Sequence, residues 1–243
     1  GYVPYPTSYG NGLELPIGWP DMDVLALCGE TARELGLRFL LGYATLVDHY
    51  QADYRPGWMR VDSSFNPYPH RALCPNSGYI EELLLPQLDE LLQRYQPDGF
   101  WLDSEGWTLA PCYCSACENE WQMLKERSAP MNRRDSLWPE WLEFHRDSYQ
   151  RYLGRVVRYL HDREPELVIA ANGAYASAHR EDPPAGIHRL TAELSAAYSL
   201  RQAGFEARLL DARALPWDLL SWTHCSARSR PAGSQPSLPV YPK

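Results

Sequence analysis

Short apolar runs that alternate with long amphipathic stretches constrain this chain more than any other feature of its sequence. The runs lie at 37–45, 100–103, 166–172 and 188–194, with a shorter one near 219–222. Between them, apolar residues recur at helical spacing over about 24–35, 78–95, 137–163 and 196–214. A nearly continuous apolar run is typical of a strand buried on both faces. Strands alternating with helices predict βαβ units and a parallel sheet, an α/β fold.

The loops favour a (β/α)8 barrel of the TIM type over a small doubly wound sheet. They are long and carry many polar and aromatic side chains after the predicted strands, at 46–76, 104–117 and 173–187. A barrel gathers its site at these C-terminal strand ends, although a doubly wound sheet does so too. No G-x-G-x-x-G or P-loop motif is present. Four or five strands are too few to close a barrel, so we expect an incomplete one, truncated at one or both ends.

We expect one partial barrel over residues 1–225 and a disordered tail over 226–243, which is rich in Ser, Pro and Gly. Asp21 is a candidate N-cap for the first helix, and Gly36 is a candidate stop. Pro86 should kink the second helical stretch or mark a late start. Residues 48–76 are predicted to form a long irregular loop, of the kind that is usually functional.

Charge and composition exclude several classes of protein. The chain has 23 basic and 31 acidic residues, a net charge of −8, so no surplus remains for the basic patch of a nucleic-acid-binding protein. No apolar run approaches the roughly 18 residues that cross a bilayer. We therefore expect no nucleic-acid partner and no membrane association. Trp and Tyr, at 9 and 16, far outnumber the 5 Phe, and their polar-edged rings favour a large polar ligand.

The strongest candidate site follows the strand at 100–103. Asp103 ends that strand and Glu105 follows two residues later, with Trp101 and Trp107 on either side. A carboxylate on rigid backbone at a cleft suits nucleophilic or acid–base work. The alternative is that Asp103 caps the next segment and Glu105 is a solvated loop acid. Glu193, at the end of the strand at 188–194, is the candidate partner, because a glycosidase needs two carboxylates across one bond.

Further polar and aromatic side chains are candidates for binding a sugar. They lie on or after the predicted strands and comprise Tyr43, His49, Trp58, Asn76, Trp101, Trp107 and Asn172. An amide offers both donors and acceptors to hydroxyl groups, and Trp and Tyr rings offer flat apolar faces. Packing in the core, or a turn in the case of Asn76, is the structural alternative for each.

Three cysteines, Cys112, Cys114 and Cys117, have the spacing of metal ligands. Cys74 is the predicted fourth ligand, because it follows the preceding strand, and His70 is the reserve. Four thiolates leave no position for water, so we expect a structural zinc ion and no organic cofactor. Disulfides are the alternative, yet the close trio would leave one cysteine over. Thiolate zinc without disulfides favours the cytoplasm, and secretion stays open if a signal precedes Gly1.

Four segments resemble the family catalogued as hypothetical glycosyl hydrolase family 6, whose members look like relatives of the α-L-fucosidases of glycoside hydrolase family 29. They are GYVPYPTSYG, ELGLRFLLGYAT, LCPNSGYIEELLLPQLDELLQRYQPDGFWLD and CYCSACENEW. The resemblance covers roughly residues 1–225 and implies a (β/α)8 barrel. The fucosidase pattern W-x-D matches Trp101-Leu102-Asp103, which implies that Asp103 is the nucleophile. The acid/base is not fixed by this pattern.

The cysteine motif is similar to that of family 42 β-galactosidases, which hold a structural zinc with an upstream Cys and a C-x-C-x-x-C cluster. That resemblance places a catalytic Glu where Glu105 stands, so the two resemblances favour different residues. We predict a glycoside hydrolase, α-L-fucosidase-like, that acts on a carbohydrate with two carboxylates. A non-catalytic carbohydrate-binding protein on the same barrel is the first alternative. A zinc-stapled interaction module is the second.

Overall fold

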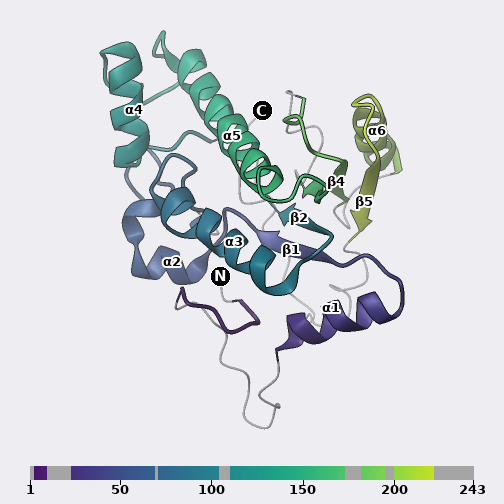
Figure 1. Cartoon of the computed structure of the whole chain (residues 1–243). Helices are drawn as coiled ribbons and strands as arrows, with labels where there is room; N and C mark the ends of the chain where they lie inside the picture. The colour runs from purple at the N-terminus through teal and green to yellow at the C-terminus, as the bar shows by residue number, and fades with distance from the viewer. Residues whose placement is uncertain are drawn as a thin grey trace, which may run out of the picture.

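The computed structural model describes residues 3–9, 23–68, 71–103, 110–172, 182–194 and 200–221. Its centre is one parallel sheet of five strands (Figure 1). The strands are β1 (Leu40–Ala44), β2 (Gly99–Asp103), β3 (Val168–Asn172), β4 (Arg189–Leu194) and β5 (Trp217–Ser221). The α/β class predicted from the alternating pattern is therefore confirmed.

Strand order separates a barrel from a doubly wound sheet. The order in space is β1-β2-β3-β4-β5, the same as the order along the chain. A doubly wound sheet reverses direction at a switch point, whereas a barrel adds each new strand on the same side as the last. The described sheet never reverses, and its first and last strands do not pair with one another. This is the arrangement of a partial barrel.

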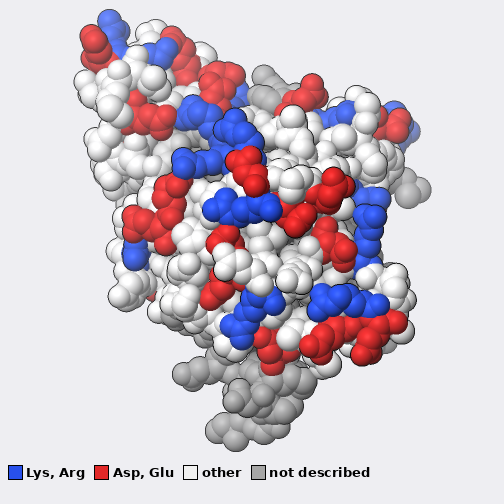
Figure 2. Space-filling view, in the orientation of Figure 1, with Lys and Arg blue, Asp and Glu red and all other residues white. Residues whose placement is uncertain are grey.

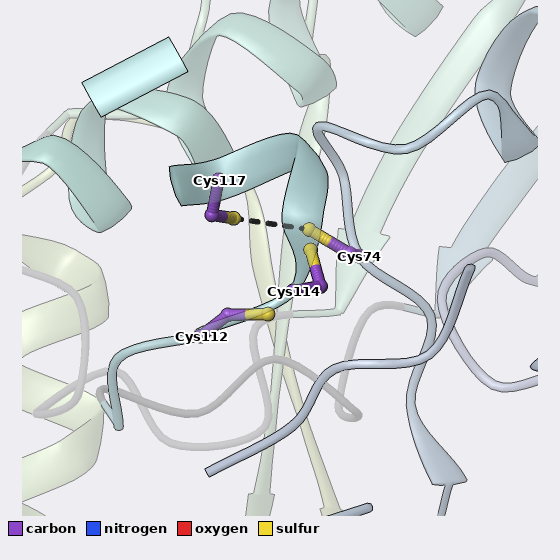
Figure 3. A group of neighbouring side chains, drawn as sticks. All are labelled: Cys74, Cys112, Cys114 and Cys117. Atoms are coloured by element: carbon purple, nitrogen blue, oxygen red, sulfur yellow. Dashed lines mark hydrogen bonds between the residues drawn. The ribbon is translucent and has the colours of Figure 1, made fainter. Parts of the chain in front are cut away.

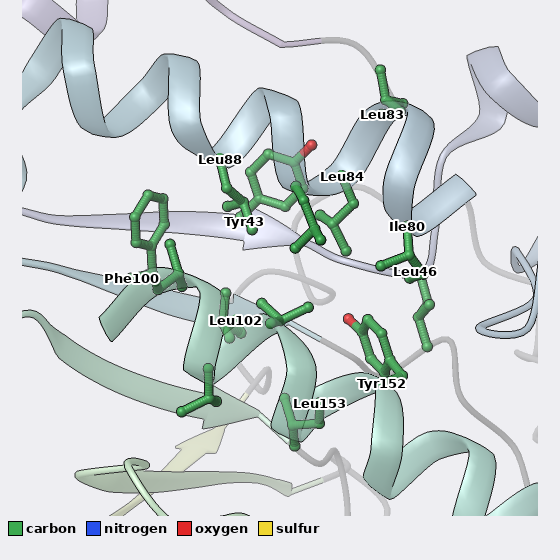
Figure 4. Close-up of a cluster of buried hydrophobic side chains, with 14 of the residues drawn as sticks. Tyr43, Leu46, Ile80, Leu83, Leu84, Leu88, Phe100, Leu102, Tyr152 and Leu153 are labelled. Atoms are coloured by element: carbon green, nitrogen blue, oxygen red, sulfur yellow. The ribbon is translucent and has the colours of Figure 1, made fainter. Parts of the chain in front are cut away.

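The helices are α1 (Val24–Glu34), α2 (His49–Tyr54), α3 (Leu85–Tyr95), α4 (Ser115–Lys125), α5 (Trp138–His161) and α6 (Leu200–Asp211), with shorter turns η1 (Pro56–Trp58) and η3 (Ile80–Leu84). Apolar residues of α3, α5 and α6 pack against one face of the sheet. Leu84 and Leu88 on the helical side meet Phe100 and Leu102 of β2 in the main core, where all four side chains are fully buried (Figure 4). Burial of such side chains is worth about 1.5–3 kcal/mol each.

The face of the molecule that carries α3 and α5 shows blue and red side chains interspersed (Figure 2). Arg155 of α5 pairs with Glu81 at 2.8 Å, and Arg163 pairs with Asp89 of α3 at 2.6 Å. These surface pairs are worth little individually, and they join α5 and the residues just after it to the η3–α3 segment. No helix among the described residues has the length and apolarity that a membrane span requires.

The predicted strand at 37–45 is buried on one face only, which corrects the sequence-based expectation. Leu41 and Tyr43 pack into the helical layer, while Leu40, Gly42 and Ala44 are exposed on the opposite face. β1 is the first strand of the described sheet and pairs only with β2. An apolar run does not reveal this, because burial of the second face depends on what the rest of the barrel places across it.

Local signals place most helix ends correctly. The N-cap of α1 is Asp23, whose carboxylate accepts from Ala26 N at 3.1 Å, so the predicted cap, Asp21, was two residues early and lies outside the described residues. Gly36 follows the helix with a φ of 68°, a conformation that favours glycine. Pro86 lies in the first turn of α3, directly after the π-helical turn η3. The predicted late start is confirmed, because proline lacks the N–H that an interior position needs.

The segment 48–76 is more ordered than an irregular loop, which is a second correction. It contains α2 and η1, and antiparallel bridges join Val47 to Ala72 and Met59 to Leu73. The prediction of a strand near 219–222 also shifts, because β5 begins at Trp217 and includes Asp218. Asp218 broke the apolar pattern, yet it pairs with Arg189 of β4 at 2.8 Å.

Gly99→Ala is expected to lower the free energy of unfolding by about 2 kcal/mol or more. A Cβ at Gly99 would lie against the Val168 carbonyl oxygen, closer than van der Waals contact allows, and the obstacle is backbone. Gly42→Ala is the matched control in the neighbouring strand, because its Cβ would meet Trp101 Cε3 at an ordinary 3.6 Å. Urea denaturation of both variants checks this. Equal losses in the two would contradict the close approach of β2 and β3.

Candidate functional site

One face of the sheet collects polar side chains at the C-terminal ends of the strands. The parallel register aligns Ala44 with Asp103, Asp103 with Asn172, and Asn172 with Thr191. Aligned residues of a parallel sheet share a face, and side chains alternate along each strand. Glu193, two residues after Thr191, therefore lies on that face as well. It is the face opposite the helical layer, which is the interior of a barrel.

Asn172 joins the two predicted carboxylates. Its Nδ2 donates to Asp103 Oδ1 at 3.1 Å and to Glu193 Oε1 at 2.8 Å. Because both oxygens accept from one nitrogen, they lie less than about 6 Å apart. Asn172 is fully buried, Glu193 is 8% exposed, and Asp103 is half-buried. The two carboxylates are thus held close together at the C-terminal ends of the strands.

The backbone at Asp103 is also held in place. Its carbonyl oxygen accepts from Thr45 N at 2.7 Å and from Thr45 Oγ1 at 2.9 Å. These bonds continue the β1–β2 ladder past the end of β1. A carboxylate on such a strand end has little freedom to move, which chemistry at a defined distance requires.

Trp101 lies two residues before Asp103 on the same face. Its Nε1 donates to Thr191 Oγ1 of β4 at 3.0 Å, and its ring is half-buried. The bond fixes the orientation of the ring across two strands. Sequence reasoning missed Thr191, although its position two residues before Glu193 in a period-2 strand was a usable signal.

The other predicted sugar-binding side chains lie elsewhere in the described structure. Tyr43 faces the helical layer, where its hydroxyl donates to Gln87 Oε1 at 2.5 Å and burial raises its pKa well above the usual value. His49 is exposed at the start of α2. Trp58 is buried edge-on to Tyr79, with ring centroids 5.8 Å apart. Sugar contacts by these residues stay predictions.

Three further predicted residues, Glu105, Trp107 and the reserve ligand His70, lie outside the described residues. The described structure thus brings Asp103, Glu193, Asn172 and Trp101 together on one face. It neither places Glu105 near them nor separates it from them.

The four predicted metal ligands converge. Cys74 comes from the loop before η3, Cys112 and Cys114 precede α4, and Cys117 lies in the first turn of α4 (Figure 3). All four are buried, and their Sγ atoms lie within 4.8 Å of one another, with Cys74 and Cys117 at 3.3 Å. A tetrahedral zinc ion with Zn–S bonds of about 2.3 Å needs sulfur atoms about 3.8 Å apart. The donor set fits such an ion.

Electrostatics within the cluster favour partial ionisation. Hydrogen bonds from Cys114 and Cys117 lower the pKa of the Cys112 thiol, while bonds to its neighbours and burial raise that of Cys74. Thiolates are the form that binds metal. Cys28, by contrast, is exposed on α1.

Neighbouring side chains support the cluster. Asn76, predicted to contact a sugar, donates from Nδ2 to Cys117 Sγ at 3.4 Å and to Ser148 Oγ of α5 at 3.0 Å. Cys112 N donates to His145 Nε2 at 3.1 Å, and burial lowers the pKa of His145 to about 3, so the ring accepts as a neutral imidazole. A ring cluster surrounds them, formed by Tyr113, Trp121, Trp141 and Phe144. Such outer contacts orient thiolate ligands and keep water away.

Comparison with known proteins identifies what the chain resembles. The family model for α-L-fucosidase matches residues 1–154. No curated protein matches the chain by sequence. Among solved structures, α-L-fucosidase isoenzyme 2 from Paenibacillus thiaminolyticus is similar, with a TM-score of 0.57 and 22% identity over 72% of this chain and 26% of that one.

Two β-galactosidases have a similar fold. The enzyme from Rahnella sp. R3 gives a TM-score of 0.57 and 15% identity over 77% of this chain and 33% of its own. The enzyme from the haloarchaeon Halorubrum lacusprofundi gives a TM-score of 0.56 and 16% identity over 74% of this chain and 33% of its own. The chain thus spans between a quarter and a third of each of these three relatives. Their folds are glycosidase barrels, which agrees with the partial barrel described above.

Proposed function

The chain belongs to the α-L-fucosidase family, and from that premise we propose that it is a glycoside hydrolase that works with two carboxylates, Asp103 and Glu193. The observation that carries the proposal is the approach of these two groups at neighbouring strand ends, bridged by the amide of Asn172. Retaining glycosidases hold their carboxyl groups about 5–5.5 Å apart, and inverting enzymes about 6.5–9.5 Å. An oxygen separation below about 6 Å favours the retaining arrangement.

Asp103 is the proposed nucleophile and Glu193 the proposed acid/base. In the first step a carboxylate oxygen of Asp103 bonds to the anomeric carbon, while the glycosidic bond breaks and Glu193 gives its proton to the leaving oxygen. In the second step Glu193 takes a proton from water, whose oxygen replaces Asp103 at the anomeric carbon. The W-x-D match supports the first assignment. Glu105 is the alternative acid/base, and it lies outside the described residues.

A carbohydrate is the proposed substrate, with an α-L-fucoside as the first choice because of the family. Trp101 presents an aromatic ring beside Asp103, held by its bond to Thr191. The apolar face of a sugar ring stacks on such a surface, and binding of this kind positions the anomeric carbon against the nucleophile. Trp107, and Asn172 in its predicted role as a sugar ligand, remain further candidates.

The cysteine cluster is proposed to hold a structural zinc ion. Cys74, Cys112, Cys114 and Cys117 supply four sulfur ligands, and such a site has no open position for a reacting water. The ion would cross-link the loop that follows β1 to the segment that follows β2. This stabilises the end of the sheet at which Asp103 lies and takes no part in bond cleavage.

A panel of aryl glycosides tests the proposal. The folded chain is assayed with p-nitrophenyl α-L-fucoside, the matching β-D-galactoside and other anomers, with release of nitrophenol as the readout. We expect hydrolysis of the α-L-fucoside above all others. A chain that unfolds cooperatively but cleaves no member of the panel would contradict the proposal. Binding of fucose without hydrolysis would then favour a non-catalytic carbohydrate-binding protein.

A further inference from the structure

We infer that Asn172 is a positioning residue, which sets the spacing of Asp103 and Glu193 and keeps the two carboxylates from sharing a proton. The inference rests on the proposed function for the roles of the two acids. This role of Asn172 differs from the sugar contact predicted from sequence, because Asn172 affects the reaction by positioning Asp103 and Glu193.

Sheet geometry explains why a mediator is needed. Asp103 is on β2 and Glu193 on β4, so their backbones are separated by two strand spacings, about 9–10 Å. Asn172 is on β3 between them, in register with Asp103 on one side and Thr191 on the other. A side chain on the middle strand is the one that reaches both, and Asn172 contacts each carboxylate.

The chemistry of the amide suits this position. Nδ2 carries two hydrogens, and each carboxylate accepts one of them. The reverse orientation would bring the amide oxygen against two carboxylates, which is repulsive, so the bonds themselves fix the orientation. Engagement of Glu193 Oε1 by an N–H directs the acidic proton of Glu193 to Oε2. The same residue thus determines which oxygen of the acid carries the proton.

Repulsion between the two carboxylates is the second reason why a side chain is needed between them. When two carboxylates lie this close and are shielded from water, their repulsion raises the pKa of one of them unless a donor stands between them. A donor N–H to each ionised oxygen opposes that rise. A nucleophile must be ionised, and the N–H of Asn172 stabilises the ionised form of Asp103.

Other titratable groups around the pair come from four elements, α5, β4, β5 and α6. Tyr152 of α5 lies close enough to interact with Asp103, and burial raises the pKa of its hydroxyl. Arg189 and Asp218 share the sheet face, with Asp218 in register with Thr191, and they pair with each other at 2.8 Å. Glu206 is buried on α6, the helix that packs against β4. Among the described residues, Asn172 is the side chain that donates to both carboxylates.

The test measures carboxyl titration directly in the full chain. Wild type and Asn172→Leu, a replacement of nearly equal size that lacks donors, are labelled with ¹³C, and the side-chain carboxyl carbons of Asp103 and Glu193 are followed against pH by NMR. We expect the pKa of Asp103 to rise by about one unit or more in the variant. Thr191→Val, which removes a hydroxyl from the same face, is the control and should leave both values within about 0.3 units.

A double variant distinguishes repulsion between the two carboxylates from a general structural change caused by Asn172→Leu. In Asn172→Leu combined with Glu193→Gln, the neighbouring charge is gone, so the raised pKa of Asp103 should fall back toward the wild-type value. If Asn172→Leu does not fold, Asn172→Ala takes its place in the same design. Unchanged pKa values in the single variant, or an equal rise in the double variant, would overturn the inference.

Turnover distinguishes this inference from the proposed function. In an active chain, loss of the bridge should move the acidic limb of the kcat/KM profile upward by the same amount as the NMR pKa of Asp103. An inactive chain with the expected NMR shift would support the bridge and count against the hydrolase. If the chain is active but the carboxyl pKa values and the pH profile do not change in Asn172→Leu, the inference about Asn172 is wrong and the proposed function stands.

Discussion

Asp103→Asn is expected to lower kcat/KM for an aryl α-L-fucoside by about a thousand-fold or more. An amide of the same shape still fills the space at the end of β2, but it cannot form the covalent bond to the anomeric carbon. Loss of a nucleophile removes an interaction made in the transition state, so kcat falls with kcat/KM and KM changes little. Steady-state kinetics with the folded variant measures both parameters.

Asp98→Asn is the matched control. Asp98 directly precedes the same strand, at its other end, where its Oδ2 accepts from Phe39 N at 2.7 Å, and asparagine keeps an oxygen acceptor there. Its turnover should stay within about two-fold of wild type. Asp103→Gly adds a chemical readout, because azide can enter the space and attack the anomeric carbon. Turnover that survives in Asp103→Asn would remove Asp103 from the nucleophile role.

Cys117→Ser is expected to reduce bound zinc from about one ion per chain to near zero and to lower the Tm by about 10 °C or more. Loss of a structural metal is among the few changes that cost more than about 4 kcal/mol. Each kcal/mol moves the Tm of a chain of this size by about 2–4 °C. Metal analysis of the purified protein and thermal unfolding by circular dichroism measure the two effects.

Cys28→Ser provides the comparison for the cysteine cluster. Cys28 is exposed on α1, outside the group of four, so its replacement should change neither zinc content nor Tm by more than the error of measurement. Addition of a strong chelator to wild type should reproduce the Tm of Cys117→Ser. A wild-type chain that is purified without metal, and whose cluster thiols react fully under native conditions, would rule out the zinc site.

Local sequence patterns predicted most of the strands and helices and the four cysteines that the structure brings together. The strands β2 and β3 and the helix α5 follow from apolar runs and helical spacing, since both patterns depend on neighbours within a few residues. Cys112, Cys114 and Cys117 lie within six residues of each other along the chain. Cys74 was found by a topological argument, because loops that follow adjacent parallel strands lie at the same edge of the sheet.

The tertiary structure alone decided which polar residues meet. Asp103, Asn172 and Glu193 are far apart in the chain, and the sequence singled out each of them without showing that Asn172 contacts both carboxylates. Which face a strand residue occupies depends on register with a partner strand, and a shift of one residue would reverse it. Strand pairing placed Tyr43 in the helical layer and Trp101 on the open face.

The sequence by itself therefore determined the α/β alternation, the strand ends that carry Asp103 and Glu193, and the cysteine spacing, because these are properties of short segments. Only the tertiary structure decided that the strands follow chain order as in a barrel, and that Asn172 stands between the two carboxylates. The physical reason is that hydrogen-bond pairing between strands sets order and register, and these contacts join residues that no local pattern connects.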